Sequence, residues 1–510
     1  MQWSERVRLF RDSTWNIASL AVSGLVGLVL VPIMFRGLGT ERYGLWLAAS
    51  SMVDIAGGLG FGLGLLIVRE VASSAGGSEA NGCERLVSTS RLLYAALGLV
   101  VLIAISAIAK PASHRLHLSH ETQVLVGPIF ILVGIAFAGE QISAVGLAVL
   151  AGLRRFDLIG SAAIALTIAN GLLTYELLRT GHSILSIACL RVGLSVTGAI
   201  ATSVMVYVIQ PSLGKWDTKF ELRTLRNHAA FIFASQANTV ISKAIFDGVT
   251  PMIGFVLGAA AIVPYRVGLK FPQFLAGVSG RIAEVLYPAS SEYHVSDSLH
   301  RLRDVLQWST RALTLVNAPV LAVLFVLGPT LLHVWIPAAP PESVQVLRIY
   351  VFAAFFDALG YAADSMLWGA GEAKALLMIL LSSGTVTLVV GFACMLHFGV
   401  AGMAIGVSAG FAVGTAQLIA FSCKKFEIPL KALLRFIFRG LALPTAVCIL
   451  SVWAICRATH PTHVYVLGLI GAAGMMLFMG CHLSLRSSWE EREILLRLFR
   501  RRLAHDGGES

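Results

Sequence analysis

Long apolar runs recur along the whole chain and constrain its fold more than any other feature. A membrane-spanning helix needs about 20 mostly apolar residues. The run from Phe231 to Pro288 must hold two helices, because Gly258 and Pro264 interrupt it near its middle. We expect spans near residues 14–35, 44–67, 90–109, 124–151, 158–178, 184–209, 230–257, 260–288, 309–334, 344–368, 376–396, 400–422, 434–456 and 464–485. The predicted fold is an all-α polytopic membrane protein with about fourteen transmembrane helices.

The composition agrees with a lipid environment. Of the 510 residues 56% are hydrophobic and only 13% are charged, whereas a soluble chain carries about 25% charged residues. The formal net charge is +11, but the cations lie in short loops between apolar runs and form no basic face for nucleic acid. The seven cysteines lack the spacing of a disulfide framework or metal site.

The distribution of Lys and Arg predicts the orientation. Alternate loops and the C-terminal tail hold about 27 of them, and the other set of loops holds about 7. Because cytoplasmic loops are enriched in Lys and Arg, we expect both termini in the cytoplasm and an even number of spans. The outer loops are short, which disfavours a membrane glycosyltransferase or polymerase and indicates a chain that is not an enzyme.

Turn signatures that recur at a nearly constant offset of about 219 residues indicate an internal duplication. The matched pairs are Leu38-Gly39 with Leu257-Gly258, Ala151-Gly152 with Ala370-Gly371, and Gly181 with Gly399. Each repeat would contain six helices in the same orientation. We therefore predict an N-lobe at 1–209, a cytoplasmic connector at 210–229, a C-lobe at 230–423, and two further helices with a basic cytoplasmic tail at 424–510. Two such lobes would surround a central cavity, as in an alternating-access transporter.

Cations inside predicted spans are the main candidates for solute binding. An Arg or Lys at the centre of a span costs about 2.5–3.5 kcal/mol, so each is expected to face a cavity or a partner. A non-transporting scaffold would have little reason to keep them. The five candidates are Lys270, Arg281, Arg266, Arg191 and Lys243.

The helix at 260–288 is the most informative of these spans. Arg266, Lys270, Arg281 and Glu284 fall within about 60° of one another on its surface. This charged stripe suits an anionic solute such as a pyrophosphate, with Arg191 as a counterpart in the N-lobe. Alternatively, Arg266 is interfacial and Arg281 pairs with Glu284 at helical spacing.

Acidic residues within the spans are candidates for coupling to H+ or Na+. Asp247 lies four residues after Lys243, so the two either neutralise each other or form a gate or proton site. The other acidic candidates are Asp54, Glu140, Asp357 and Asp364. For each of these four, a helix–helix hydrogen bond is an equally good interpretation.

We expect no metal and no cofactor. The histidines His114, His117 and His120 crowd one outer loop but have no neighbouring Cys or Asp. No Gly-rich loop ending in Gly-Lys-Ser/Thr is present, so ATP is not expected to be the direct energy source.

Five segments, taken together in their order along the chain, resemble the polysaccharide (O-antigen type) flippases of the multidrug/oligosaccharidyl-lipid/polysaccharide exporter superfamily. The segments are PIMFRGLGTERYGLWL (32–47), VDIAGGLGFGLGLLIVREVA (53–72), FPQFLAGVSGRIAEVLYPASSE (271–292), WGAGEAKALL (368–377) and FGVAGMAIGVSAG (398–410). The resemblance implies two six-helix bundles with two extra helices, and movement of undecaprenyl-diphosphate-linked oligosaccharide from the inner to the outer leaflet of a bacterial plasma membrane. It also implies a polysaccharide polymerase and a chain-length regulator as partners.

Two relatives remain as alternatives. Lipid II flippases share the fourteen-helix plan but tend to have charges within the first helix, which here is uncharged between Asp12 and Arg36. Drug/cation antiporters of the superfamily usually have about twelve helices and acidic cavities, whereas the cavity predicted here is basic.

Overall fold

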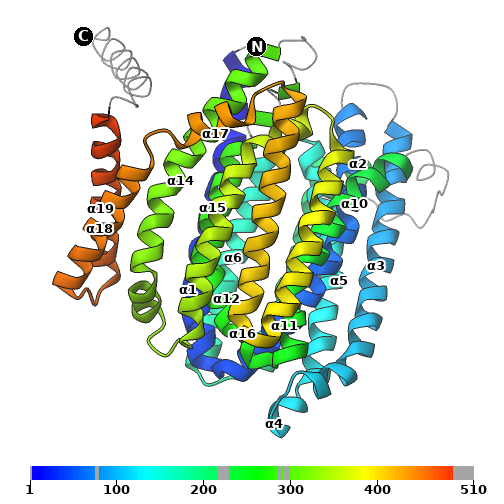
Figure 1. Cartoon of the computed structure of the whole chain (residues 1–510). Helices are drawn as coiled ribbons and strands as arrows, with labels where there is room; N and C mark the ends of the chain where they lie inside the picture. Colours follow the sequence, from blue (N-terminus) through cyan, green and yellow to red (C-terminus); the bar gives the residue numbers. More distant parts are fainter. Residues whose placement is uncertain are drawn as a thin grey trace, which may run out of the picture. The chain divides into compact units, whose positions relative to one another are not determined.

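The computed structural model describes residues 3–74, 80–214, 229–284, 286–287, 290–291 and 299–485. Regular structure in these residues consists of helices. The chain divides into two compact units, Met1–Val263 and Pro264–Ser510. In each unit long helices run alongside one another (Figure 1).

The first unit contains the following helices: α1 (Trp3–Gly57), η1 (Gly58–Gly60), α2 (Phe61–Ser74), α3 (Ala80–Arg115), α4 (His120–Gln123), α5 (Val126–Gly152), α6 (Phe156–Arg179), α7 (Ile184–Ile209), α8 (Pro211–Gly214), α10 (Ala229–Phe246), α11 (Val249–Leu257) and η2 (Ala259–Ala261). Its apolar core joins α2, α3, α5 and α7 around Leu66, Leu86 and Val149.

The second unit contains the following helices: α12 (Ile262–Ala283, which begins two residues before the division), α14 (Leu299–Trp335), α15 (Glu342–Gly369), α16 (Ala373–Lys425), α17 (Leu430–Phe438), α18 (Ala442–Thr459) and α19 (Val464–Ser484). One core cluster joins α14, α15, α16 and α17. A separate cluster packs α18 and α19 on α14.

The helices confirm a polytopic membrane protein. Eleven stretches of the described residues are long and apolar enough to cross a bilayer. Two of these, Ala18–Gly60 and Ala373–Lys425, contain a break in helical geometry, at Gly39 and at Gly399. The 22-residue helix α12 is also long enough to span but carries more charge. Within the described residues, the number of spans therefore lies between 11 and 14.

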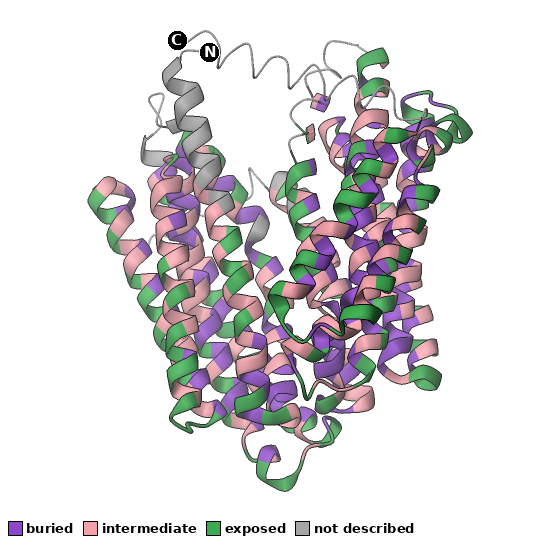
Figure 2. Cartoon of the chain, turned by 90° about the vertical axis from the view of Figure 1, so that its left-hand side faces the viewer, coloured by how far each residue is buried: buried purple, intermediate pink, exposed green. Residues whose placement is uncertain are grey.

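Large apolar side chains lie exposed along the helices, as a lipid environment requires. Leu172, Val208, Leu469 and Met476 are 64%, 73%, 68% and 69% exposed, and exposed positions follow the helices along their length (Figure 2). A soluble protein rarely exposes contiguous apolar surface of this extent. These outward faces are therefore suited to contact lipid.

The order and length of the helices repeat along the chain. The helices α3 and α14 have 36 and 37 residues, and α5 and α15 have 27 and 28. The parts of α16 before and after Gly399 correspond to α6 and α7. This repetition agrees with the duplication expected from the sequence.

The turns at equivalent places have the same backbone conformation. Gly39 has φ 74° and ψ 172°, and Gly258 has φ 95° and ψ 161°, a region that residues with a Cβ rarely adopt. After α5 and α15, Arg154 and Gly371 have φ 55° and 77°, and in both turns the next N–H donates to the carbonyl five residues earlier. Gly371 is thus equivalent to Arg154, and the expected match with Gly152 was wrong by two residues.

The compact units do not coincide with the predicted lobes. The helices α10 and α11, which begin the second repeat, pack within the first unit. Of the predicted connector at 210–229, residues 215–228 lie outside the described residues, as does the basic tail from residue 486. The division into lobes stays a prediction.

Candidate functional site

An arginine–glutamate pair lies inside the first unit. Arg191 on α7 donates from Nε to Glu140 Oε1 on α5 at 3.0 Å and from Nη2 to Glu140 Oε2 at 3.4 Å. Arg191 Nη1 also donates to the hydroxyl of Ser50 on α1 at 3.0 Å. The guanidinium lies 5.9 Å from the ring of Trp46, within cation–π range. Three helices thus hold one cation within a membrane span.

Close packing of α5 on α7 brings this pair together. A Cβ added to Gly139 would lie 2.8 Å from Ser195 Oγ and 3.3 Å from the backbone carbonyl carbon of Ser195, so a larger residue here would force Ser195 to shift. Small residues at membrane helix contacts commonly allow such close packing. Glu140 follows Gly139 directly on α5, and Arg191 lies one turn before Ser195 on α7. The contact between Gly139 and Ser195 therefore brings the side chains of Glu140 and Arg191 to the same level.

The cavity beside this pair has a volume of about 530 Å³. The helices α1, α5, α6 and α7 line it with polar and apolar residues. The polar and aromatic members are Trp46, Ser50, Glu140, Ser143, Thr167, Asn170, Arg191 and Ser195. The sequence identified Arg191 and Glu140 as candidates, but not the neutral polar residues of α6.

A second ion pair in the same unit joins Lys243 of α10 to Asp247 in the turn that follows this helix. The distance from Lys243 Nζ to Asp247 Oδ2 is 3.5 Å. Both side chains are about one-third exposed, at 39% and 34%. Asp54 on α1 interacts electrostatically with Arg191, Glu140, Lys243 and Asp247. All five candidates from this part of the chain therefore belong to one electrostatic group.

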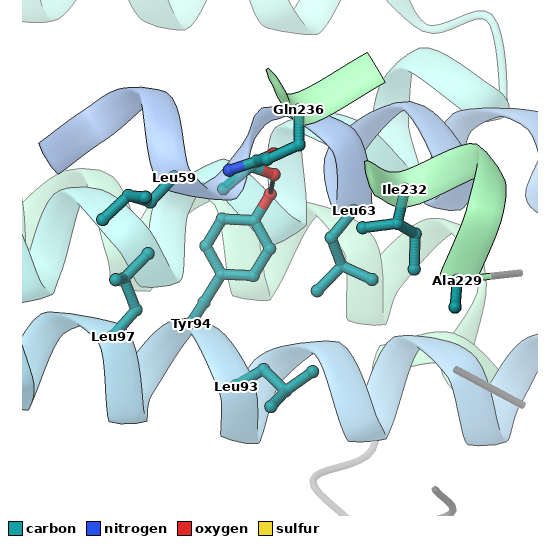
Figure 3. A pocket seen from close by; sticks show the side chains of 9 residues that line it. Leu59, Leu63, Leu93, Tyr94, Leu97, Ala229, Ile232 and Gln236 are labelled. Carbon is teal, nitrogen blue, oxygen red and sulfur yellow. Dashed lines mark hydrogen bonds between the residues drawn. The ribbon is translucent and has the colours of Figure 1, made fainter. Parts of the chain in front are cut away.

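Gln236 of α10 stabilises the η1 segment, at which the helix that contains Asp54 ends. Its amide group donates to the carbonyl of Gly58 at 3.0 Å and accepts from the N–H of Gly62 at 2.7 Å. The Tyr94 hydroxyl of α3 donates to the carbonyl of Gly60. These residues border a mostly apolar cavity of about 440 Å³, in which Tyr94 and Gln236 point toward the broken segment (Figure 3). The glycines are evident in the sequence, but nothing in it predicts that the side chains of Gln236 and Tyr94 hydrogen-bond to the backbone groups of these glycines.

Two cations of the second unit lie one turn apart on α12. Arg266 and Lys270 are partly buried and lie within electrostatic range of each other. Neither forms an ion pair with an acidic residue in the described part of the chain. They are thus an uncompensated pair of positive charges on a membrane helix.

The predicted acidic residues of the second unit lie on α15. Asp357 accepts a hydrogen bond from the Tyr361 hydroxyl at 2.6 Å and interacts electrostatically with Asp364. Tyr350 lies within electrostatic range of both Asp357 and Arg266. Arg154 and Gly371, which occupy equivalent turns, are 217 residues apart, and the same offset makes Asp357 equivalent to Glu140. The partner of Asp357 is the phenol of Tyr361, whereas the partner of Glu140 is the guanidinium of Arg191.

Arg281, at the end of α12, forms an ion pair with Glu284 at 3.2 Å. Both side chains are exposed, at 65% and 64%. This is the alternative pairing that helical spacing allowed. The positive charge of Arg281 is therefore balanced locally, unlike those of Arg266 and Lys270.

A large apolar cavity of about 630 Å³ lies in the second unit between α14, α15 and the α17–α18 segment. Phe325, Phe352, Phe355, Phe356 and Phe438 contribute to its lining. Within the described residues no group of three or more His, Cys, Asp or Glu side chains could hold a metal ion.

Comparison with known families gives a match over more than half of the chain. The model of the family described as polysaccharide biosynthesis protein matches residues 9–294. A putative O-antigen transporter of Shigella flexneri is 21% identical over 385 residues, which cover 73% of this chain and 87% of that protein.

Solved structures with the same fold are transporters. The lipid II flippase MurJ in an inward closed conformation has a TM-score of 0.71 and 15% identity, covering 94% of this chain and 99% of its own. An inward-facing multidrug resistance MATE transporter of the MOP superfamily has a TM-score of 0.64 and 16% identity, covering 82% and 96%. At these identities the likeness shows a common fold.

Proposed function

The chain belongs to the polysaccharide biosynthesis protein family and is a multi-pass membrane transporter with the fold of the MOP superfamily, and from this premise we propose that it is a flippase for undecaprenyl-diphosphate-linked oligosaccharide. It moves this lipid from the inner to the outer leaflet of a bacterial plasma membrane during the synthesis of O-antigen, exopolysaccharide or capsule. The name of the Shigella flexneri relative and the family description support this substrate class.

The uncompensated cations on α12 are the observation that carries the proposal. A diphosphate is an anion that must cross the apolar core of the bilayer, where a charge is costly. Arg266 and Lys270 lie one turn apart and form no ion pair with described acidic residues. They can therefore bind the diphosphate without first breaking an existing ion pair, whereas Arg281 is already paired with Glu284.

We propose about fourteen spans, with both termini in the cytoplasm and two six-helix bundles that alternately open a central path to each leaflet. Arg191 in the first repeat and Lys243 in the second add further positive charge, and Asp54, Glu140, Asp247, Asp357 and Asp364 are proposed sites for coupling to H+ or Na+. A polysaccharide polymerase and a chain-length regulator are the proposed partners downstream.

The test is to neutralise the α12 cations in the host cell. We expect Lys270→Gln and Arg266→Gln to lower the translocation rate by at least about tenfold each, because a hydrogen bond between charged groups contributes about 1.5–3 kcal/mol. The readout is surface polysaccharide, together with the amount of diphosphate-linked oligosaccharide that remains on the inner leaflet.

Arg281→Gln is the matched control, since it removes a positive charge from the same helix. We expect a smaller loss from it, because Glu284 already balances that charge. Membrane abundance of all three variants is measured in parallel. Wild-type translocation in both Lys270→Gln and Arg266→Gln would contradict the proposed role of α12.

A further inference from the structure

Several polar groups that line the cavity beside Arg191 have unused hydrogen-bonding capacity. In the described residues Ser143 Oγ and the Nδ2 group of Asn170 form no protein hydrogen bond, and Asn170 Oδ1 receives only a long one of 3.5 Å from Thr174. The hydroxyl hydrogen of Ser50 remains available, because Ser50 accepts from Arg191. Polar groups within a membrane span are costly unless they meet a polar partner. The lining of the cavity is therefore suited to bind a polar solute.

The charges of the cavity favour an uncharged solute over an ion as its main occupant. Its lining includes one cation, Arg191, and one anion, Glu140, and these two are hydrogen-bonded to each other. A phosphate would have to compete with Glu140 for Arg191, and a metal cation would have to compete with Arg191 for Glu140. An uncharged solute with several donors and acceptors avoids both conflicts.

The size and the lining of the cavity favour a pyranose ring as the solute. A volume of about 530 Å³ lies within the range of small-molecule sites, about 300–1,000 Å³. Trp46 and Leu166 give it apolar surface beside the hydroxyl, amide and carboxylate groups. A pyranose ring has apolar C–H faces and a rim of hydroxyl groups, and it matches both kinds of lining.

We propose that this cavity of the first unit is a subsite for an uncharged glycosyl residue, such as a hexose or an N-acetylhexosamine, of the transported oligosaccharide. The proposal deepens the proposed function and rests on it for the identity of the solute. The diphosphate and the sugar would then be recognised by different residues, the former by Arg266 and Lys270 and the latter by Asn170, Thr167, Ser143 and the Arg191–Glu140 pair.

Direct binding of simple sugars tests this subsite without any transport step. The purified full-length protein in lipid nanodiscs is titrated with methyl glycosides of glucose, galactose, mannose, rhamnose and N-acetylglucosamine, and saturation-transfer difference NMR reports the contacts. We expect at least one glycoside to bind saturably in the millimolar range, an affinity typical of one small solute with few contacts. Inorganic pyrophosphate should not displace it.

Substitutions on α6 then locate the binding. Asn170→Leu should weaken the affinity for the glycoside by at least about tenfold and Thr167→Val by about threefold, because each leaves a sugar hydroxyl without a partner. Thr197→Val is the matched control, since Thr197 is exposed on α7, donates to its own helix at 2.8 Å and does not line the cavity. Ser143→Ala provides a milder variant if Asn170→Leu fails to fold.

The proposal is overturned if no glycoside binds to the wild-type protein, or if Asn170→Leu, Thr167→Val and Ser143→Ala all keep the wild-type affinity. These outcomes are separate from a failure of the proposed function. A chain that binds glycosides in this cavity but moves no lipid-linked oligosaccharide in cells would refute the flippase and not the subsite.

Discussion

Single charged residues within the bilayer form bonds that the sequence could only partly predict. Arg191 and Glu140 were identified because charges are rare in apolar spans. Their mutual pairing was not, since it joins α7 to α5 across 51 residues and depends on the close approach at Gly139. By contrast, Lys243–Asp247 and Arg281–Glu284 are pairs within one turn, and helical spacing was sufficient to suggest them.

The Arg191–Glu140 pair gives a stability prediction. Glu140→Gln or Arg191→Gln should each lower the unfolding temperature, with a cost of about 1–3 kcal/mol, because one partly buried charge loses its counter-charge. The double variant should be less destabilised than the sum of the two single variants. Thermal unfolding of the protein in detergent measures all three. Additive losses would show that the two side chains do not interact.

Helical elements were well predicted where apolar length decided them. The span expected at 184–209 coincides with α7, Ile184–Ile209, and the break at Gly258 separates α11 from η2 as expected. The extension of α3 to Ala80–Arg115 beyond the expected 90–109 was missed, because its additional turns are polar and lack the apolar signal. The role of Gln236 at the Gly58–Gly62 break also escaped prediction, since it requires α10 to pack beside η1.

The close contact within α16 gives a prediction for this element. A Cβ at Gly406 would lie 2.1 Å from the Cα of Gly391, so Gly406→Ala must push the two parts of α16 apart. We expect a loss of about 1–3 kcal/mol in stability from this overpacking, seen as a lower unfolding temperature.

Gly468→Ala on α19 is the matched control, because no atom lies within 4 Å of the added Cβ. Its unfolding temperature should equal or slightly exceed that of the wild type. Equal effects of the two substitutions would contradict the close packing of the α16 segments.

At the scale of the whole molecule, the sequence predicted the fold class but not the compact units, and the repeat that it indicates agrees with the order and lengths of the helices. Apolar periodicity and glycine turns are local signals, so they located the helices and indicated a repeat. The packing of α10 within the first unit depends on contacts such as the hydrogen bonds of Gln236 with Gly58 and Gly62, which no local pattern encodes.

The proposed topology predicts the side of each loop. Alkaline phosphatase fused near Gly181 or in the loop at 116–123 should be active outside the cell, whereas green fluorescent protein fused near Arg154 or at 424–430 should fluoresce inside. Reporter activity of truncation fusions in the host measures both. Fluorescence of a fusion near Gly181 would show that the orientation is reversed or that a span is missing.

The central claim is that this transporter moves a diphosphate-linked oligosaccharide, and the most direct test is to deplete the protein in its host and to analyse the lipid-linked intermediates by leaflet-resolved mass spectrometry. We predict that an undecaprenyl-diphosphate-linked oligosaccharide accumulates on the inner leaflet, which would also identify its sugars. Accumulation of lipid II, or no change in any lipid-linked intermediate, would contradict the proposed substrate.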